Sequence, residues 1–404
     1  MMGNVLMINF PGEGHINPSI GVTKELQSRG EKVVYYAVEE YAEKIKKTGA
    51  EVRLYPDFRD DLSFGRSRTG DEKMDFAEIG LNMAKKADEI VQLIYREVKD
   101  EQYDYVIFDH HFLAGKIIAE MMGLPCISLC TTFAMDEELI HSFGKTHQTG
   151  LENSPCLEQL QQFLLELSDR YPVSLSQPFD VFSCPGDITI VFTSREFQPH
   201  AERFGEDYLF VGPSVTSRHD PGSFPMHELE GETVIVISMG TIFNRQKEIY
   251  NMCIDALQDF DGKVVMSIGR HTNPDELNDI PDHFIVKPYI PQLELLKTAD
   301  LFVTHGGMNS TNEGLYFDTP LIVIPMGGDQ FFVASQVERA GAGVKLDKTE
   351  LTSEVLREKV KEVLENRSYA DSAADIGKSL RSAGGYKRAA DAIFELVHET
   401  VEKG

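Results

Sequence analysis

Short apolar segments alternate with amphipathic segments along the whole chain. Segments that are apolar on both faces are typical of strands in a parallel sheet that helices cover on both sides. Helical periodicity follows them at 19–29, 76–99 and 112–122. The expected strands are residues 4–10, 32–38, 105–109, 125–130 and 187–193 in the first half, and 233–240, 263–269, 300–307 and 320–328 in the second. We therefore predict an α/β fold with two doubly wound sheets.

A proline-rich segment near the midpoint separates the two halves. Residues 213–230, PSVTSRHDPGSFPMHELE, contain three prolines and a glycine and have no apolar period, which is typical of a linker. A chain of 404 residues is long enough for two or three domains. We predict domains over 1–212 and 231–386, the linker over 213–230, and an amphipathic C-terminal helix over 387–404.

The net charge excludes several classes of partner. The chain has 39 Lys and Arg against 65 Asp and Glu, a formal charge of −26, which repels nucleic acid and anionic membrane surfaces. The five cysteines have no zinc-like spacing, and the N-terminus lacks the basic region of a signal peptide. These features predict a cytoplasmic protein. A small anion is still a possible ligand, because helix N-termini bind anions without lysine or arginine.

The first expected strand runs into the turn PGEGHINP. Gly12 and Gly14 complete only half of a dinucleotide-binding fingerprint, because Asn17 stands where a third glycine would be. Asn17 followed by Pro18 predicts instead an N-cap and the first position of a helix. His15 would then lie just before that helix, at the carboxyl end of a strand, where open α/β sheets bind ligands.

His15 and Asp109 are the candidate catalytic residues. The positive end of the helix favours a neutral His15, which can accept a proton as a general base. Asp109 ends the strand YVIFD, and a carboxylate bonded to one imidazole nitrogen fixes the tautomer and stabilises the cation. The alternatives are a loop histidine bonded to the backbone and an N-cap aspartate. We treat His110 and His111 as secondary because they point away from Asp109.

The second half contains a denser motif within residues 288–330. The turn HGG after one strand leads into NS at a helix start, and such a turn with a helix N-terminus forms an anion site. Side-chain donors add to the backbone amides. The candidate diphosphate-binding residues here are His305, Gly307, Asn309 and Ser310.

A second turn of the same kind follows another strand of the second half. Ser238, Gly240 and Thr241 end the strand TVIVISMG, and two such turns on neighbouring strands could clamp a pyrophosphate from two sides. We find no D-x-D carboxylate pair beside this site, and we therefore expect no obligatory metal.

Three further residues suit sugar hydroxyl groups. The Glu313 carboxylate can accept hydrogen bonds from ribose, although Ser310-x-x-Glu313 also matches a capping box. Asp329 and Gln330 follow a strand and offer adjacent acceptors and donors. The order PQ, HGG-x-NS, E, DQ is far more specific than any of its parts.

With these motifs the sequence resembles the UDP-glycosyltransferase superfamily, the family-1 glycosyltransferases, over essentially its full length. It is most similar to the bacterial macrolide and flavonoid enzymes. The resemblance implies the glycosyltransferase B fold, in which two Rossmann-like domains face each other, with the acceptor held mainly by the first and the donor by the second. It also implies that the C-terminal helix packs back on the N-terminal domain, and that the protein is a monomer.

The resemblance assigns a role to each motif residue. His15 would be the base and Asp109 its partner, and Tyr289 stands where plant enzymes have a tryptophan that stacks on uracil. Ile290 would contact uracil through its backbone. Of the remaining donor-binding residues, Gln292 and Glu313 would lie at the ribose, His305, Asn309 and Ser310 at the diphosphate, and Asp329 and Gln330 at the sugar. Gly327 stands where plant enzymes often have a tryptophan beside the donor sugar. The choice of donor sugar therefore stays open.

These assignments predict inverting transfer of a sugar, most simply glucose, from a UDP-sugar to a small hydrophobic acceptor. Flavonoids, macrolides and other hydroxylated natural products are the expected acceptors, and the UDP-sugar is a co-substrate with no further cofactor. Phe112, Phe133 and Met135 follow sheet-edge turns and are candidates for an apolar acceptor pocket, with core packing as the alternative. A non-catalytic nucleotide-sugar-binding protein is the second hypothesis. A third hypothesis, a nicotinamide-dependent oxidoreductase, is disfavoured because Asn17 stands where the dinucleotide-binding fingerprint has its third glycine.

Overall fold

The computed structural model describes residues 3–62, 75–136, 138–139, 154–216, 224–241 and 246–403. The chain forms two compact units. Unit 1 comprises residues 1–192, 200–214 and 384–404, and unit 2 comprises 193–199 and 215–383. The segment 193–199 thus belongs to unit 2 although it directly follows a unit 1 strand, a crossing that the sequence does not predict. Part of the predicted linker, 217–223, lies outside the described residues.

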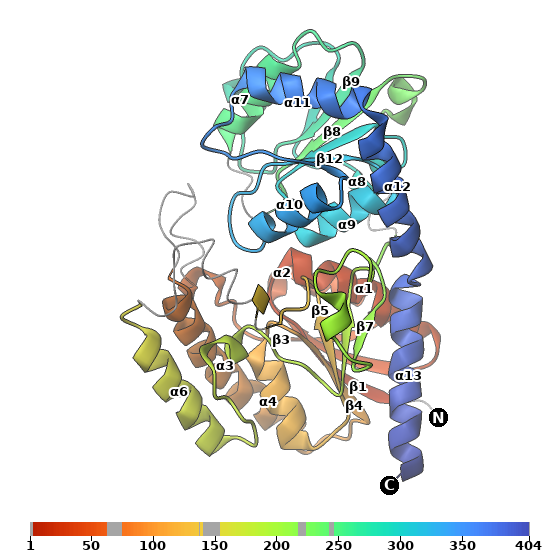
Figure 1. The fold of residues 1–404 in the computed structure, drawn as a ribbon. Helices are drawn as coiled ribbons and strands as arrows, with labels where there is room; N and C mark the ends of the chain where they lie inside the picture. The colour runs from red at the N-terminus through yellow and green to blue at the C-terminus, as the bar shows by residue number, and fades with distance from the viewer. Residues whose placement is uncertain are drawn as a thin grey trace. The chain divides into compact units, whose positions relative to one another are not determined.

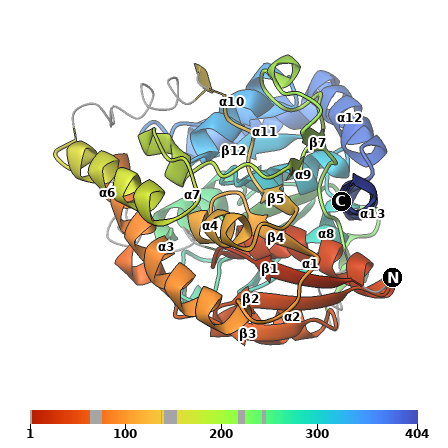
Figure 2. The same cartoon turned by 90° about the horizontal axis from the view of Figure 1, so that it is seen from below.

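Unit 1 contains a seven-stranded, entirely parallel sheet in the order β3-β2-β1-β4-β5-β6-β7. Several of these strands follow one another across the view in Figure 2. The strands are β1 (Asn4–Ile8), β2 (Lys32–Ala37), β3 (Glu51–Leu54), β4 (Tyr105–Asp109), β5 (Cys126–Cys130), β6 (Ile188–Val191) and β7 (Tyr208–Phe210).

Helices pack on both faces of this sheet (Figure 1), as the sequence pattern predicts. The helices of unit 1 are α1 (Glu13–Ser28), α2 (Glu39–Lys46), α3 (Phe76–Val98), α4 (Leu113–Met122), α6 (Leu157–Arg170) and α13 (Gly385–Lys403). The C-terminal helix α13 packs against α1, and its Ala389, Ala390 and Ile393 join the unit 1 core. Among the described residues, we find no helix long and apolar enough to span a membrane.

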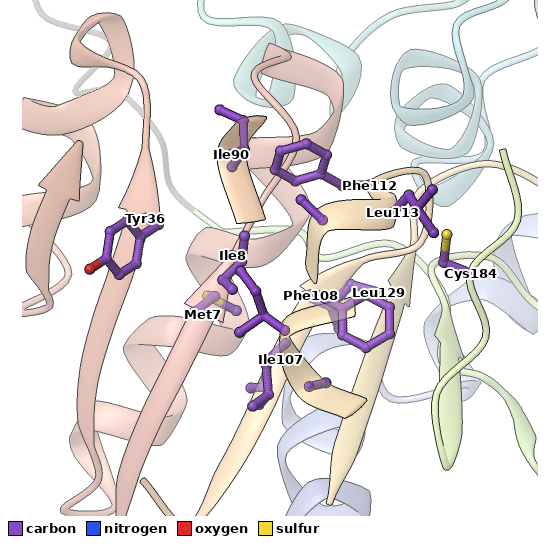
Figure 3. Packing of buried hydrophobic residues seen from close by; sticks show 14 of the residues in the cluster. Met7, Ile8, Tyr36, Ile90, Ile107, Phe108, Phe112, Leu113, Leu129 and Cys184 are labelled. Carbon is purple, nitrogen blue, oxygen red and sulfur yellow. The ribbon is translucent and has the colours of Figure 1, made fainter. Parts of the chain in front are cut away.

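Packing in the core of unit 1 fixes the register between β1 and β4. Met7 and Ile8 pair with Ile107 and Phe108, and all four side chains are fully buried. Figure 3 shows these residues between the sheet and its helices. Because the two strands are parallel and in this register, residues just beyond Ile8 and at Asp109 emerge at the same edge of the sheet.

Unit 2 contains a six-stranded parallel sheet in the order β10-β9-β8-β11-β12-β13. Its strands are β8 (Val234–Ser238), β9 (Lys263–Ser267), β10 (Phe284–Lys287), β11 (Leu301–Thr304), β12 (Leu321–Val323) and β13 (Gly343–Lys345). Its helices are α7 (Lys247–Ala256), α8 (Gln292–Leu296), α9 (Met308–Tyr316), α10 (Gln330–Arg339), α11 (Ser353–Glu365) and α12 (Arg367–Ser382). Figure 1 shows α7 and α11 on one face of this sheet and α9 and α10 on the other.

All nine predicted strands are present, and the structure adds four more. The added strands β3, β7, β10 and β13 are the four edge strands of the two sheets. Each has three or four residues with at least one partly or fully exposed position. β3 and β13 lack the apolar run by which the central strands are recognised, and the apolar runs of β7 and β10 are short. An edge strand is covered less completely than a central one, so it needs fewer apolar residues.

The start of α1 corrects one prediction. The helix begins at Glu13 with Gly12 as its N-cap, so Asn17 and Pro18 lie inside it instead of capping it. Asn17 is buried, and its amide oxygen accepts a hydrogen bond from Lys44 on α2. The prediction was wrong because an Asn-Pro pair is a local signal, and the buried contacts of this segment extend the helix by a full turn.

Candidate functional site

His15 and Asp109 form a hydrogen-bonded pair at the carboxyl edge of the unit 1 sheet. His15 lies in the first turn of α1, and Asp109 is the last residue of β4. The His15 Nδ1 lies 2.8 Å from the Asp109 Oδ2. The Asp109 carboxylate is fully buried, whereas 22% of the His15 side chain is exposed. An imidazole that donates Nδ1–H to a carboxylate is held in the tautomer whose Nε2 is the proton-accepting nitrogen.

The Asp109 carboxylate remains ionised at neutral pH. Burial by itself raises the pKa of this carboxyl, but the electrostatic interaction and hydrogen bond with His15, together with those with His111, lower it below its usual value. The His111 backbone amide donates to Oδ1 over 2.8 Å. The predicted alternative, an N-cap, does not apply, because α4 begins after Phe112.

Two residues around His15, Thr131 and Phe10, were not singled out from the sequence, and a third, His111, was treated there as secondary. The Thr131 hydroxyl lies 3.1 Å from His15 Nδ1, and the Phe10 ring packs against the imidazole with a centroid distance of 4.9 Å. The His111 ring lies edge-on to the His15 ring at 5.7 Å, so His111 belongs to the surroundings of His15 and is not merely a neighbour in sequence. Phe10 is the second residue after β1 and Thr131 the first after β5, so a search of the two residues that follow each strand would have found both.

Asn9 holds the turn that presents His15. It is buried, and its amide nitrogen donates to the His15 carbonyl oxygen over 3.2 Å and to the Tyr35 hydroxyl over 2.8 Å. The turn between β1 and α1 is therefore fixed to β2, which restrains the backbone of His15 before any ligand binds.

The residues predicted for the acceptor lie at this edge of unit 1. Phe112 is buried and stacks on Phe58 at a centroid distance of 5.7 Å. Its edge meets Phe10 at 5.9 Å. Phe133 is also buried, whereas Met135 is partly exposed. Phe112 therefore contributes to an aromatic cluster whose partly exposed member, Phe10, lies beside His15.

In unit 2, the His305 ring lies against both predicted glycine turns. They follow β8 and β11, which are neighbouring strands, with Ser238 paired to Thr304. The His305 ring lies so close to both turns that a Cβ on Gly240 or on Gly307 would come within 2.5 Å of it. Gly240 also has a φ of 72°, a left-handed conformation that favours glycine. Both glycines are thus required by the position of one imidazole.

The His305 imidazole is neutral at pH 7. Removal from water lowers its pKa to about 4, and a hydrogen bond to the Ser238 backbone opposes that shift only in part. A neutral imidazole cannot supply a full positive charge, so backbone dipoles would carry most of the attraction for an anion at this position.

The N-terminus of α9 lies directly after the His305 turn. Gly307 is the N-cap, and no side chain caps the helix. Amides of the first turn, which includes Asn309 and Ser310, therefore point along the axis toward the sheet edge. The capping-box alternative for Ser310 and Glu313 is wrong, since Ser310 occupies the third helical position and not the N-cap.

Three predicted donor-binding residues form one hydrogen-bonded group. Gln292, the first residue of α8, donates its amide to Glu313 Oε2 over 2.8 Å and lies 3.4 Å from the Ser310 hydroxyl. Glu313 is almost fully buried on α9. The PQ part of the motif, at the start of α8, and the HGG-x-NS-x-x-E part, at the start of α9, thus meet at one place.

The remaining donor candidates lie at the ends of other strands of unit 2. Tyr289 is half exposed and Thr241 is exposed, whereas Ile290 is partly buried. The Gln330 side-chain oxygen accepts hydrogen bonds from the Met326 and Gly327 amides over 2.8 and 3.3 Å, so its NH₂ group is the part that could bind a ligand. Asp329 directly precedes α10. In the described part of the chain, no group of three or more His, Cys, Asp and Glu side chains is placed to hold a metal ion.

Comparison with known proteins adds independent evidence. Residues 251–389 match the family model described as the erythromycin biosynthesis protein CIII-like C-terminal domain. The chain is 58% identical over 402 residues to the protein described as "Uncharacterized UDP-glucosyltransferase YojK" of Bacillus subtilis (strain 168), covering 99% of both chains. It is 33% identical over 394 residues to the NDP-glycosyltransferase YjiC of Bacillus licheniformis, covering 96% of each. The chain belongs to the family-1 glycosyltransferases.

A solved structure of this family supports the fold. The calicheamicin glycosyltransferase CalG4 is 26% identical, with a TM-score of 0.84 over 98% of both chains. The two parallel α/β sheets of this glycosyltransferase therefore form a glycosyltransferase B fold, as the sequence predicts. The matched family model covers most of the predicted donor motif, from Tyr289 to Gln330, but not the β8 turn. The roles of the individual site residues stay predictions.

His110, the neighbour of Asp109, should make the enzyme sensitive to acid. Burial lowers the pKa of His110 to about 3, and its Nδ1 and Nε2 contact the Ser128 and Ser183 hydroxyls. In the unfolded chain its pKa is about 6.5, so the unfolded state binds one more proton between these values. The stabilisation is complete above about pH 6.5 and is lost as the pH falls toward 3.

We expect the free energy of unfolding of the wild type to fall more steeply than that of His110→Gln as the pH is lowered from 6 to 4. The difference between the two slopes should be about 1.4 kcal/mol per pH unit. Urea unfolding followed by circular dichroism at several pH values measures this difference. The variant will be less stable at pH 7, because Ser183 loses its partner, but only the slope reports the titration. Equal slopes for the two proteins would contradict the prediction.

Proposed function

We propose that this enzyme transfers glucose from UDP-glucose to a hydroxyl group of a small hydrophobic natural product, with inversion at the anomeric carbon. The observation that carries the proposal is the 2.8 Å hydrogen bond between His15 and the buried Asp109, beside the partly exposed ring of Phe10. Unit 1 supplies the base and unit 2 supplies the donor site.

His15 removes the proton of the acceptor hydroxyl through Nε2. The acceptor oxygen then attacks the anomeric carbon as the bond from that carbon to the β-phosphate oxygen breaks, and UDP leaves with the bonding electron pair. The proton remains on His15, and Asp109 stabilises the imidazolium through the Nδ1–H bond. A single displacement of this kind inverts the configuration.

The diphosphate is held by dipoles. Its developing negative charge faces the uncapped first turn of α9 and the β8 turn at Gly240, with His305 between them. These groups are fixed by packing before the donor binds, so they need little reorganisation during the reaction. Ser238, Thr241, Asn309 and Ser310 add hydroxyl and amide donors.

The nucleoside and sugar contacts follow from the same motif. Glu313, oriented by Gln292, accepts hydrogen bonds from the ribose hydroxyls, and Tyr289 and Ile290 contact the uracil. The Asp329 carboxylate and the Gln330 NH₂ group bind the sugar. The description of YojK as a UDP-glucosyltransferase supports UDP-glucose as the donor.

The His15 and Asp109 assignments are tested by His15→Ala and Asp109→Asn. General-base catalysis contributes about 10²- to 10⁴-fold, so kcat should fall by at least about 100-fold in both variants. The Kd for UDP, measured by calorimetry, should not change, because the donor site lies in unit 2. A His15→Ala variant with near-normal turnover would refute the base assignment.

UDP binding without transfer, in the wild type and across a broad panel of acceptors, would favour the auxiliary-protein hypothesis instead. Mass spectrometry of mixed phenolic and macrolide acceptors with several UDP-sugars provides that test. Production of a glycoside with a sugar other than glucose would correct the donor while leaving the mechanism intact.

Phe10 should contribute to acceptor binding. Its ring contacts His15 and completes an aromatic cluster with Phe58 and Phe112. We expect Phe10→Ala to raise the KM for an aromatic acceptor by about tenfold, as loss of a buried aromatic contact of about 1.5 kcal/mol implies, with the KM for UDP-glucose unchanged. Phe163→Ala, at a partly buried position on α6, is the control. An unchanged acceptor KM in Phe10→Ala would place the acceptor elsewhere.

We propose further that the reaction requires no metal ion, since the dipoles described above replace it at the diphosphate. Treatment with EDTA should leave kcat/KM within about twofold of its value in untreated enzyme. A large loss that Mg²⁺ or Mn²⁺ restores would show that a cation shares the diphosphate charge.

A further inference from the structure

The guanidinium of Arg270 lies on the half-exposed ring of Tyr289. The Arg270 guanidinium carbon is 4.9 Å from the centroid of the Tyr289 ring. Half of the Tyr289 residue surface is exposed, and Arg270 is exposed as well. Within the part of the chain that the structure describes, this ring is the only interaction found for the guanidinium. In a protein with a net charge of −26, such a cation is unexpected.

The backbone brings these two residues side by side. The ladder between β9 and β10 continues past both strands, with the Ile268 amide donating to Lys287 and the Gly269 amide donating to Pro288, over 3.0 and 3.1 Å. Gly269 has a φ of 72°, so only glycine adopts this turn easily. Arg270 directly follows Gly269, and Tyr289 directly follows Pro288. The hydrogen-bonded backbone therefore holds Arg270 and Tyr289 close together.

We propose that Arg270 is a positioning residue that holds the Tyr289 ring as a stacking platform for the nucleobase of the donor. The inference rests on the proposed function, in which Tyr289 contacts the uracil. Arg270 acts on one face of the ring, and the base stacks on the other.

The physical argument concerns the freedom of an exposed side chain. A half-exposed tyrosine samples several rotamers, and binding a base to it must immobilise the ring. A guanidinium stacked on one face is attracted by the negative face of the ring and restricts that motion before the ligand arrives. Preorganisation of this kind increases affinity without adding a contact to the ligand.

The position of Arg270 in the sheet separates it from the phosphate site. The diphosphate turns follow β8 and β11, whereas Arg270 and Tyr289 follow β9 and β10, on the side of the sheet away from β11. Arg270 is thus placed for the base end of the donor. A direct contact of Arg270 with phosphate is the competing explanation, and the experiment distinguishes the two.

The test is a double-mutant cycle with Arg270→Ala, Tyr289→Ala and the double variant, measured by calorimetry with UMP and UDP. A cation–π contact at an exposed site corresponds to about a threefold change in Kd. We expect Arg270→Ala to weaken both nucleotides about threefold, to raise the KM for UDP-glucose equally and to leave kcat unchanged. In the Tyr289→Ala background the same substitution should have no effect, because its target is gone.

Two variants control for charge and for folding. Arg367→Ala removes the same charge from α12, at a side chain that is 89% exposed, and should not change the Kd. Arg270→Lys keeps the charge but loses the planar stack, and its Kd should lie between those of the wild type and Arg270→Ala. Thermal unfolding verifies that each variant is folded.

Three results would overturn the inference. The first is an Arg270→Ala effect that is larger for UDP than for UMP and persists in the Tyr289→Ala background, which would indicate direct phosphate contact. The second is an unchanged Kd in Arg270→Ala while Tyr289→Ala weakens binding, which refutes the role of Arg270 and leaves the base site intact. The third is an unchanged Kd in Tyr289→Ala itself, which would refute the base site of the proposed function as well.

Discussion

Parallel pairing of buried strands is the constraint on which the rest of this structure depends. When every strand in a sheet runs the same way, all carboxyl ends meet at one edge, and the turns that follow them are brought together however far apart they are in sequence. In unit 1 this brings His15, after β1, to Asp109, at the end of β4. In unit 2 it brings the turn after β8 to the turn after β11.

The two units use this edge in different ways. At this edge unit 1 holds the buried carboxylate of Asp109, which is hydrogen-bonded to one imidazole and one backbone amide. Unit 2 has glycine turns and an uncapped helix N-terminus at the predicted anion site, and its central histidine is neutral. An acidic protein can therefore handle a diphosphate, because fixed dipoles attract the anion without a cluster of lysines or arginines.

Much of this arrangement could be predicted from the sequence, and the errors have a common cause. The central strands are buried on both faces and were all found, whereas the edge strands β3, β7, β10 and β13 are partly exposed and were missed. The Asn17-Pro18 pair and the Ser310-Glu313 pair matched capping signals, yet both lie within helices. Local signals of this kind compete with burial, and tertiary packing decides the outcome.

The sequence by itself determined the fold class and the family, and it predicted the candidate catalytic pair and the candidate donor motif. These are recorded in apolar periodicity and in the order of motifs along the chain. Only the tertiary structure decided that Asn9 anchors the His15 turn to Tyr35, that Thr131 and Phe10 lie beside His15, and that Arg270 stacks on Tyr289. The contacts of Asn9 with Tyr35, of Thr131 with His15 and of Arg270 with Tyr289 connect different strands or the turns after them. Their distances depend on register and twist, which no single stretch of sequence specifies.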